Sequence, residues 1–305
     1  MMLITLIIVA TIVFFMLIPY LTKREVKSAK ASVTEASRAS PSLSKEELEL
    51  KIDKVKAVLK DSKLDTVRLK PINKKPRSVT SSKFGGNPYW PLTMDYPTDG
   101  TGQPLHLLAQ LNFSELPKLE HYPESGLLQF FIANDDVYGY EFASPGQDPV
   151  DLATNPKNFR VIYHESMNSS ELLTDFPVKD DDCYLPLNEE YAIEATLDNE
   201  VASVSDYRFE RIDFGHTLDD DVMDYFYDHE SALGSKIGGY AHFTQDDPRG
   251  YLAKEDWWLL FQMDTEYSEA VDIMWGDSGV GNFFIRPRDL KNKDFNKVWY
   301  NWDCC

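Results

Sequence analysis

The sequence predicts an α+β fold that is rich in strands, is built from two related halves and is preceded by an N-terminal transmembrane helix. Three observations lead to this prediction. Short motifs recur at an almost constant distance along the chain. Most apolar runs after residue 80 are short and rich in β-branched and aromatic residues, which is typical of strands. The segment 1–21 carries no charged side chain.

The recurring motifs indicate an internal duplication. A Lys-x-Gly-Gly motif at residues 83–86 returns at residues 236–239, which is 153 residues later. Two further apolar motifs, at residues 107–111 and 130–132, return after 152 and 153 residues. This period is too long for a solenoid, whose repeats span about 20–50 residues. We therefore expect two halves, roughly residues 80–190 and 232–305, packed as one unit with a connecting strand and helix region between them.

The N-terminal segment 1–21 is long enough and apolar enough to cross a bilayer. Basic residues follow this segment directly, at 23, 24, 27 and 30, and none precedes it. The positive-inside rule therefore predicts a single-pass anchor in the cell membrane with the rest of the chain in the cytoplasm. The alternative is a cleaved signal peptide, which would have a basic start and a shorter apolar core. Residues 22–43 are polar and rich in Ser and Ala, so we expect a tether that leads to a domain at 44–305.

This domain should begin with a helix. Ser44 and Glu47 have the spacing of a capping box, and apolar residues follow at helical intervals. The helix should run to about Ser62, because Pro71 and Pro76 prevent any continuation. We expect its apolar stripe to pack on the domain, although a helix of this kind can also lie on a membrane surface.

Further along, the pattern predicts mostly buried strands, a half-exposed strand and two helices. The half-exposed strand is Tyr207–Asp213, where apolar and polar residues alternate. A helix is expected at Leu218–Glu230, with acidic residues at its start, where the helix dipole favours them. Aromatic residues spaced from Phe295 to Trp302 predict a closing helix. The buried strands are expected at Leu107–Leu111, Leu127–Ala133, Phe159–His164, Trp257–Met263 and Asn282–Arg286.

Charge is distributed unevenly along the chain, and this distribution limits the classes of partner that we expect. Residues 1–77 contain 16 Lys and Arg against 8 Asp and Glu, a charge of +8. Residues 78–305 contain 15 against 42, a charge of −27. Nucleic acid is therefore excluded as a partner, because phosphate binding needs basic residues. A basic protein partner or cations would be attracted, although solubility alone also accounts for an acidic surface.

No familiar catalytic or metal motif is present. The Gly-Asp-Ser-Gly run at residues 276–279 resembles the surroundings of a serine protease nucleophile, but the rest of a protease sequence is missing, so we interpret it as a turn before a strand. The six His residues lack metal-binding spacing, and the paired glycines lack the GK[ST] of a phosphate-binding loop. The cysteines give no disulfide framework, and the roles of Cys304 and Cys305 stay open. We predict no catalytic residue, no metal and no cofactor.

The duplicated lysines are the best site candidates. Basic residues are scarce after residue 77, yet one precedes each Gly-Gly pair. Under a structural interpretation, each Lys pairs with a nearby carboxylate and fixes a turn. Under a functional interpretation, both lysines bind an anionic group in a shared cleft. The ligand-binding candidates are Lys83, Gly85, Gly86, Gln110, Lys236, Gly238, Gly239, Gln245 and Asp277.

Seven ordered segments resemble the YwqG-like family, a bacterial domain of unknown function. They include SKFGGNPYWP, LLAQLNFSELP, KIGGYAHFTQDDPR and IMWGDSGVGNFFI. The resemblance covers about residues 44–305 and leaves out the expected anchor and tether. It implies an α+β fold with internal duplication. It brings no established activity and no catalytic residues, and an association with secreted toxins and immunity proteins is only a hint.

We therefore expect a membrane-tethered cytoplasmic binding module rather than an enzyme. Its acidic surface would hold a basic protein, such as a toxin or a secretion component. The alternative is an enzyme or small-ligand binder with a cleft between the two halves. A binding module should present an acidic face without buried ionisable clusters, whereas an enzyme should have a concave pocket with convergent polar groups and shifted pKa values.

Overall fold

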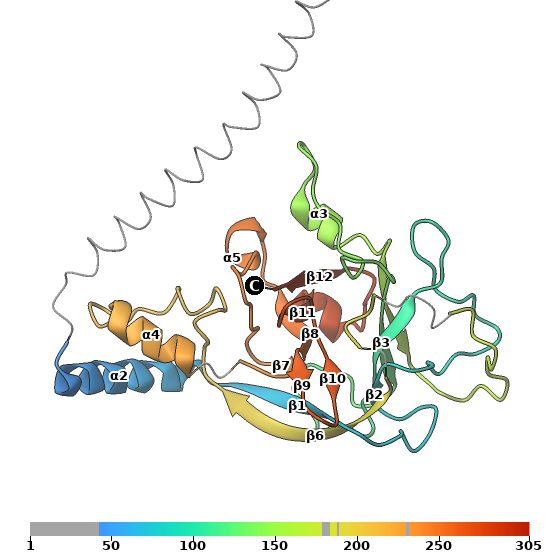
Figure 1. Ribbon diagram of the computed structural model, residues 1–305, viewed down its shortest axis with the longest axis horizontal. Coiled ribbons are helices and arrows are strands. Elements are labelled where there is room, and N and C mark those ends of the chain that lie inside the picture. Colours follow the sequence, from blue (N-terminus) through green and yellow to red (C-terminus); the bar gives the residue numbers. More distant parts are fainter. Residues whose placement is uncertain (1–42, 179–183, 188, 230–231, 305) are drawn as a thin grey trace, which may run out of the picture. The chain divides into compact units, whose positions relative to one another are not determined.

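The computed structural model describes residues 43–178, 184–187, 189–229 and 232–304 (Figure 1). The anchor expected at residues 1–21 and nearly all of the expected tether lie outside these residues. Within the described ranges, no helix combines the length and the apolar character that crossing a bilayer requires. The structure therefore does not support the predictions of a transmembrane helix and of a single-pass membrane protein.

The chain divides into two units, residues 1–50 and 51–305, which are described separately. The described part of the first unit holds the start of α2 (Lys45–Leu59). The hydroxyl of Ser44 donates to Glu47 (2.7 Å), and the backbone N–H of Glu47 donates back to Ser44 (3.3 Å). The predicted capping box is therefore confirmed. In the second unit α2 continues to Leu59 and is followed by η1 (Lys60–Ser62), which agrees with the predicted end of the helix.

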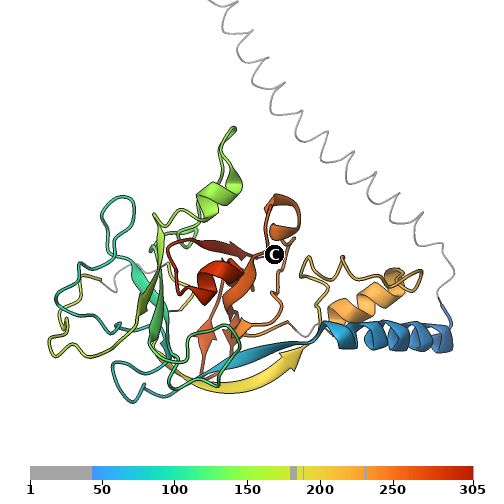
Figure 2. The same ribbon diagram turned by 180° about the vertical axis from the view of Figure 1, so that it is seen from behind.

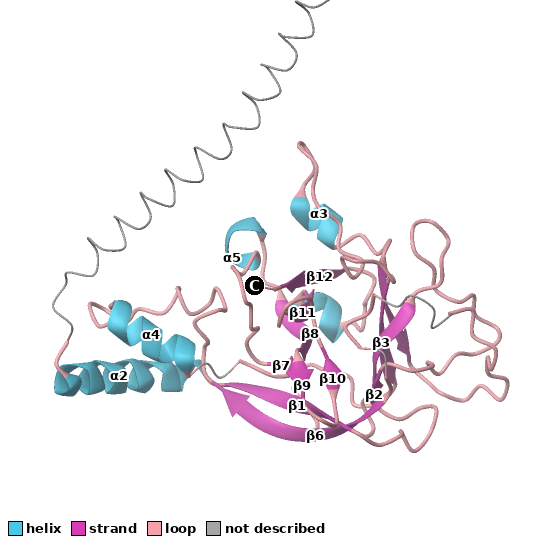
Figure 3. Ribbon diagram, viewed as in Figure 1, coloured by secondary structure: helices cyan, strands magenta, loops and turns pink. Residues whose placement is uncertain are grey.

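The second unit is built on one antiparallel sheet of ten strands (Figure 3). Neighbouring strands follow the order β12-β11-β8-β7-β1-β6-β2-β3-β4-β5. A separate pair, β9 and β10, forms a small ribbon. The strands are β1 (Leu64–Ile72), β2 (Lys83–Phe84), β3 (His106–Asn112), β4 (Leu127–Ile132), β5 (Phe159–His164), β6 (Tyr191–Glu200), β7 (Lys236–Gly238), β8 (Trp258–Asp264), β9 (Glu266–Tyr267), β10 (Asp272–Ile273), β11 (Val280–Ile285) and β12 (Val298–Asp303).

The large sheet curls into a nearly closed barrel, and only 16% of the described residues are helical. The predicted α+β class is therefore wrong, because the antiparallel sheet dominates the fold. The two edge strands approach each other through side chains. The ring of Phe159 in β5 lies 5.3 Å from that of Tyr300 in β12. Aromatic contacts of this kind cover strand edges that would otherwise offer unpaired backbone groups.

Strand alternation divides the side chains between the barrel interior and its outer face. In β4, Phe130 and Ile132 point into the main core, and in β11 Phe283 and Ile285 do the same. The rings of Phe130 and Phe283 lie 4.9 Å apart, so the interior is filled by side chains from both ends of the sheet order. The outer face of the same strands carries the buried amide side chains of Gln129 in β4 and Asn282 in β11.

The strands of the two predicted halves form two separate groups in the sheet, one on each side of β1 and β6. β2 to β5 come from the first predicted half, and β7, β8, β11 and β12 from the second. β1 and β6 lie between these two groups and pair with each other over nine residue positions. β1 also pairs with β7, and β6 also pairs with β2. These two strands therefore join the groups into one sheet.

Several predicted elements are confirmed and two are wrong. The five buried strands correspond to β3, β4, β5, β8 and β11. Tyr207–Asp213 forms turns instead of a strand, and its backbone bonds are local, as in the bond from Phe209 N to Asp206 O. The expected closing helix is strand β12, because pairing with β11 overrides its helix-like aromatic spacing.

Apart from α2, the helices of the described residues are short. α4 (Asp220–Asp228) confirms the predicted helix and lies along the Lys51–Leu59 part of α2 (Figures 1 and 2). Lys51 pairs with Asp219, whose carboxylate also accepts from Val222 N and so caps α4. The remaining helices are α3 (Pro149–Ala153), α5 (Arg249–Leu252) and α6 (Pro287–Lys291).

Candidate functional site

The two Lys-x-Gly-Gly turns occupy corresponding places in the sheet. Lys83 of β2 lies opposite Gln110 of β3, and Lys236 of β7 lies opposite Gln262 of β8. All four glycines have positive φ, between 65° and 73°, which confirms the prediction of a positive φ in these pairs. The four glycines are Gly85, Gly86, Gly238 and Gly239.

The hydrogen bonds around the two turns also match. The side-chain amide of Gln110 donates to two backbone carbonyls and accepts from one backbone N–H, all at 2.9 Å. Gln262 makes the same three bonds at 2.8 Å. The backbone partners are at positions 79, 81 and 89 for Gln110 and at positions 232, 234 and 242 for Gln262. Each partner of Gln262 is therefore displaced from its counterpart by the same distance along the chain as the two lysines.

Each lysine has its own glutamate. Lys83 Nζ donates to Glu190 (2.8 Å), and Lys236 Nζ donates to both carboxylate oxygens of Glu200 (2.7 and 2.9 Å). The Lys236 side chain is fully buried. Burial lowers the pKa of Lys236 to about 8, although the charge of Glu200 acts in the opposite direction. These contacts agree with the structural interpretation of the lysines.

The glycines give the glutamates room. A Cβ on Gly239 would lie 2.2 Å from Glu200 Oε1, and a Cβ on Gly86 would lie 2.5 Å from Glu190 Oε1. Each glutamate therefore packs directly against the turn that carries its lysine. The strands β2 and β7 are separated in the sheet by β6 and β1. A shared ligand between the two lysines stays a prediction without direct support from these contacts.

A second buried ionic cluster was missed by sequence reasoning. Arg249 donates to Asp206 (2.8 Å) and to Asp247 (2.7 Å), and Arg208 donates to Asp206 (2.7 Å). Burial alone would raise the pKa of Asp206, but the charges of Arg249 and Arg208 outweigh burial and lower it. The sequence feature that could have revealed this cluster is the DDPR run at residues 246–249, which contains Asp247 and Arg249. Its partner Asp206 adjoins the stretch that we predicted as a strand.

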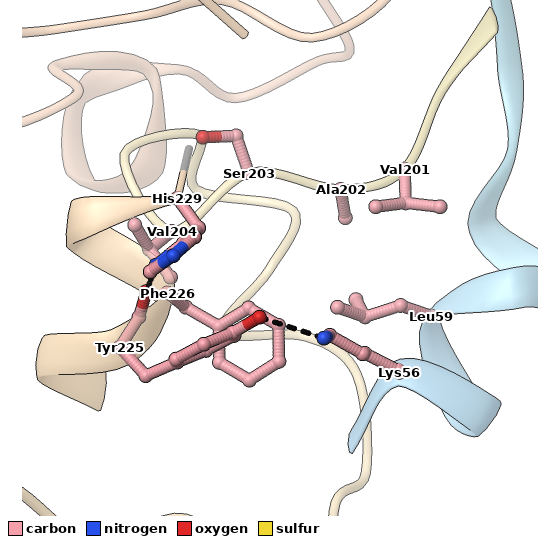
Figure 4. Close-up of a pocket in the computed structure, with 9 residues that line it drawn as sticks. All are labelled: Lys56, Leu59, Val201, Ala202, Ser203, Val204, Tyr225, Phe226 and His229. Atoms are coloured by element: carbon pink, nitrogen blue, oxygen red, sulfur yellow. Dashed lines mark hydrogen bonds between the residues drawn. The ribbon is translucent and has the colours of Figure 1, made fainter. Parts of the chain in front are cut away.

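A hollow of about 270 Å³ lies where α4 faces α2 (Figure 4). We call it the helix hollow. Its rim is polar: Lys56 Nζ donates to the Tyr225 hydroxyl (2.7 Å), and the ring of His229 stacks on that of Tyr225 at 4.2 Å. Its lining is mostly apolar and consists of Lys56, Leu59, Val201, Ala202, Ser203, Val204, Tyr225, Phe226 and His229.

The exposed face of α4, the helix that lines this hollow, is acidic. Asp220, Asp224 and Asp228 are spaced four residues apart and are exposed. Tyr227 is also exposed, at 56%. Val222 and Phe226 of the same helix are buried, so α4 is amphipathic. The helix therefore presents carboxylates and one aromatic ring to the solvent.

A second hollow, of about 350 Å³, is lined from both predicted halves, and we call it the turn hollow. Its residues include Gly238 and Gly239, which sequence reasoning singled out, but Lys236 does not line it. The guanidinium of Arg208 lies 4.2 Å over the ring of Tyr240, and it reaches this hollow. The rings of His121 and Trp258 lie 5.2 Å apart on another wall.

The remaining predicted site residues have structural surroundings. The side chain of Gln245 donates to the carbonyl of Cys304 (2.7 Å). Asp277 is exposed in a turn that the bond from Gly279 N to Trp275 O closes (2.7 Å), which confirms the turn interpretation of this run. Among the described residues, no three His, Cys, Asp or Glu side chains gather in a way that could hold a metal ion.

The chain belongs to a family that is described as a domain of unknown function (DUF1963), whose profile matches residues 82–304. No curated protein matches the chain. The name YwqG-like stays a prediction. The matched range begins at Ser82, so it leaves out α2 and also β1, although β1 is an inner strand of the sheet.

Proposed function

We propose that this domain is a binding module for a basic segment of another protein, with the helix hollow and the acidic face of α4 as the binding surface. The observation that carries the proposal is that α4 lines an apolar hollow with Tyr225 and Phe226 and exposes a row of carboxylates on the same helix. An apolar side chain of the partner would enter the hollow, and Lys or Arg side chains on either side of it would pair with α4.

The chemistry of the two surfaces is complementary to such a segment. Leu59, Val204 and Phe226 give the hollow apolar walls, and burial of one large apolar side chain contributes roughly 1.5–3 kcal/mol. Asp224 and Asp228 supply negative charge along the helix. The excess of carboxylates after residue 77 adds long-range attraction, which raises the rate of encounter with a basic partner.

The buried ionisable groups support binding rather than catalysis. Buried clusters are present, contrary to our expectation for a binding module, but their charges are paired within the protein. Lys236 is paired with Glu200, and Arg249 is paired with Asp206 and Asp247. A catalytic acid or base needs a proton-transfer partner in a substrate, and these groups are turned toward one another.

The test uses two labelled peptides and measures fluorescence anisotropy. One peptide carries a single Trp between runs of Lys, and the other carries Ala in place of Trp. We expect the Trp peptide to bind about tenfold more tightly, because its ring enters the hollow. Val204→Trp fills the hollow and should remove this difference. Asp224→Asn with Asp228→Asn should weaken both peptides.

A matched pair of charge changes controls for the general acidity of the domain. Asp95 and Asp175 are exposed on loops outside α4, and the double change to Asn removes the same charge. It should leave the preference for Trp unchanged. The proposal is wrong if the two peptides bind equally well, or if the α4 and the loop variants weaken binding to the same extent.

A small-molecule site in the turn hollow is the second candidate. The observation in its favour is that Arg208, His121 and Trp258 meet on its walls, which combines a guanidinium with two rings. A fragment screen by NMR should then show ligands that shift the Trp258 indole N–H signal. These ligands should lose their binding in Trp258→Ala. Ligands that bind this variant unchanged would rule out the turn hollow.

A further inference from the structure

The turn hollow has a fixed guanidinium in its lining. Arg208 lines the hollow, and its side chain is 22% exposed. Its Nε and Nη2 donate to the two carboxylate oxygens of Asp206 (2.8 and 2.7 Å), and Nη2 also donates to the carbonyl of Gly239 (3.0 Å). The ring of Tyr240 covers one face of the guanidinium at 4.2 Å. The group is therefore held in one orientation before any ligand arrives.

One end of this guanidinium is not used by the protein. Nη1 of Arg208 makes no hydrogen bond to any residue that the structure describes, because the bonds of this side chain all come from Nε and Nη2. A guanidinium only donates, so Nη1 can be satisfied only by an acceptor. Carboxylate and phosphate oxygens form the strongest bonds of this kind, because both partners are charged. The free end of Arg208 therefore favours an anionic group in the turn hollow.

The other charges in the lining are exposed and contribute less. Asp65 and Glu120 belong to the lining, and the side chain of Glu120 is 85% exposed beside His121, with 3.5 Å between Oε1 and Nε2. Lys63 is exposed as well and adds a cation. Exposed charges interact weakly through water, and at physiological salt they are screened beyond about 8 Å. The half-buried Arg208 therefore decides which sign of charge the hollow prefers.

The same hollow has an aromatic wall. The ring of Trp258 lies 5.2 Å from that of His121, at an interplanar angle of 38°. Trp258 is only half-buried, so part of its surface is accessible to a ligand. Aromatic rings stack favourably on such a surface. The volume of about 350 Å³ is within the roughly 300–1,000 Å³ of small-molecule sites, so the hollow has room for a ring system.

Tyr122 holds two walls of the hollow together. Its hydroxyl accepts from the backbone N–H of Gly238 (3.0 Å) and donates to the carbonyl of Leu259 (2.6 Å). A Cβ on Gly238 would lie 2.6 Å from Cδ2 of Leu119, so the glycine turn packs directly against this segment. The walls are therefore formed before binding, which reduces the entropy that a ligand has to offset.

We propose that the turn hollow binds a small molecule in which a carboxylate or phosphate group is attached to a planar aromatic ring. The ring would lie against Trp258 and His121, and the anionic group would accept from Nη1 of Arg208. Lys63 would add electrostatic attraction. This inference rests on the second candidate function, the small-molecule site in the turn hollow, and does not involve the helix hollow.

The test follows the indole N–H signal of Trp258 in NMR titrations of the full chain, where Trp258→Ala identifies the signal by its absence. Indole-3-acetate carries a ring and a carboxylate, adenosine monophosphate a ring and a phosphate, and tryptamine an indole ring and an ammonium. We expect at least one of the two anions to bind tenfold or more tightly than tryptamine, because only an acceptor satisfies Arg208. The tighter of the two identifies the anionic group. Acetate or inorganic phosphate, without the ring, should bind about tenfold more weakly than the matching ring compound.

Three variants and a control connect this preference to single residues. Lys63→Gln should weaken the anions about threefold, whereas Lys60→Gln, which changes an exposed lysine outside the lining, should leave them unchanged. Arg208→Lys keeps the charge but loses the planar fork, so it should weaken them about tenfold. His121 has a φ of 72°, which glycine adopts without strain. His121→Gly should therefore weaken every ring probe while the melting temperature falls by less than about 2 °C.

The outcomes separate this inference from the function on which it rests. If tryptamine binds as tightly as both anions and all three lose binding in Trp258→Ala, the small-molecule site is supported and the preference for an anion is wrong. If neither anion shifts the Trp258 signal, the inference is wrong whether or not neutral fragments bind. Equal effects of Lys63→Gln and Lys60→Gln would also contradict it, and these two variants decide even if Arg208→Lys does not fold.

Discussion

At the scale of single residues, the two duplicated lysines differ in how far water could hydrate the partner glutamate if the lysine were removed. Lys236 and Glu200 are both fully buried, whereas Glu190, the partner of Lys83, is 26% exposed. A carboxylate that loses its cation in a dry interior cannot recover its hydration. The Lys–Glu pair therefore contributes differently to the free energy of unfolding in the two turns.

We expect Lys236→Met to lower the free energy of unfolding by about 3 kcal/mol, because Glu200 stays buried with Arg68 as its remaining charged partner. Lys83→Met should cost only about 1 kcal/mol, because Glu190 can be hydrated. Urea unfolding of both variants checks this order. Equal losses, or a larger loss for Lys83→Met, would contradict it.

Gly239 is constrained by both its backbone and its neighbour. It has a φ of 73°, and a Cβ would contact Glu200 at 2.2 Å. Gly102 has a φ of 87° but nothing within 4 Å of its Cβ position. Gly102→Ala should therefore cost about 1 kcal/mol of backbone strain, and Gly239→Ala clearly more. Thermal unfolding separates the two, and similar costs would show that Glu200 moves aside easily.

At the scale of elements, β1 is the strand on which the sheet depends most. It pairs with β6 over nine positions and with β7 over three, and so connects the two groups of strands. Its Val67 and Leu69 are buried in the main core. The region that the family profile matches begins only after this strand.

A chain that starts at Ser82 should therefore not fold cooperatively. It lacks β1, so β6 and β7 would expose unpaired backbone groups in the middle of the sheet. A chain that starts at Lys45 retains α2 and β1 and serves as the control. Circular dichroism and denaturant unfolding compare the two. A sharp transition of similar stability in the shorter chain would show that the sheet closes without β1.

At the scale of the whole molecule, the buried charges make the free energy of unfolding dependent on pH. The pKa of Asp206 is lowered below its ordinary value of 3.8, chiefly because the charges of Arg249 and Arg208 outweigh burial. The unfolded state then binds this proton more readily than the folded state does. The contribution of Asp206 is present above its unfolded pKa and is lost as the pH falls through its folded pKa.

Asp206→Asn should lower the free energy of unfolding at neutral pH by about 3–5 kcal/mol, because Arg249 loses one of its two carboxylates. The variant should also lose less stability than the unaltered protein as the pH falls below about 4. Urea unfolding at a series of pH values measures both effects. Parallel pH profiles would show that Asp206 does not contribute to acid unfolding.

The sequence by itself determined the local features of this protein. The capping box, α4 and the buried strands β3, β4, β5, β8 and β11 follow from short-range periodicity, because each depends on neighbours within a few residues. The positive φ of the paired glycines was also predictable, since Gly-Gly after a buried strand residue permits it. The repeated motifs also drew attention to Lys83 and Lys236, which lie at corresponding places in the sheet.

Only the tertiary structure decided the rest. β1 and β6 are stabilised by pairing partners that are distant in the chain, and β12 became a strand because β11 offers it a full set of hydrogen bonds. The partners of the lysines, Glu190 and Glu200, are likewise distant in sequence. A linear pattern records which residues are near in the chain, whereas these sites depend on which strands become neighbours.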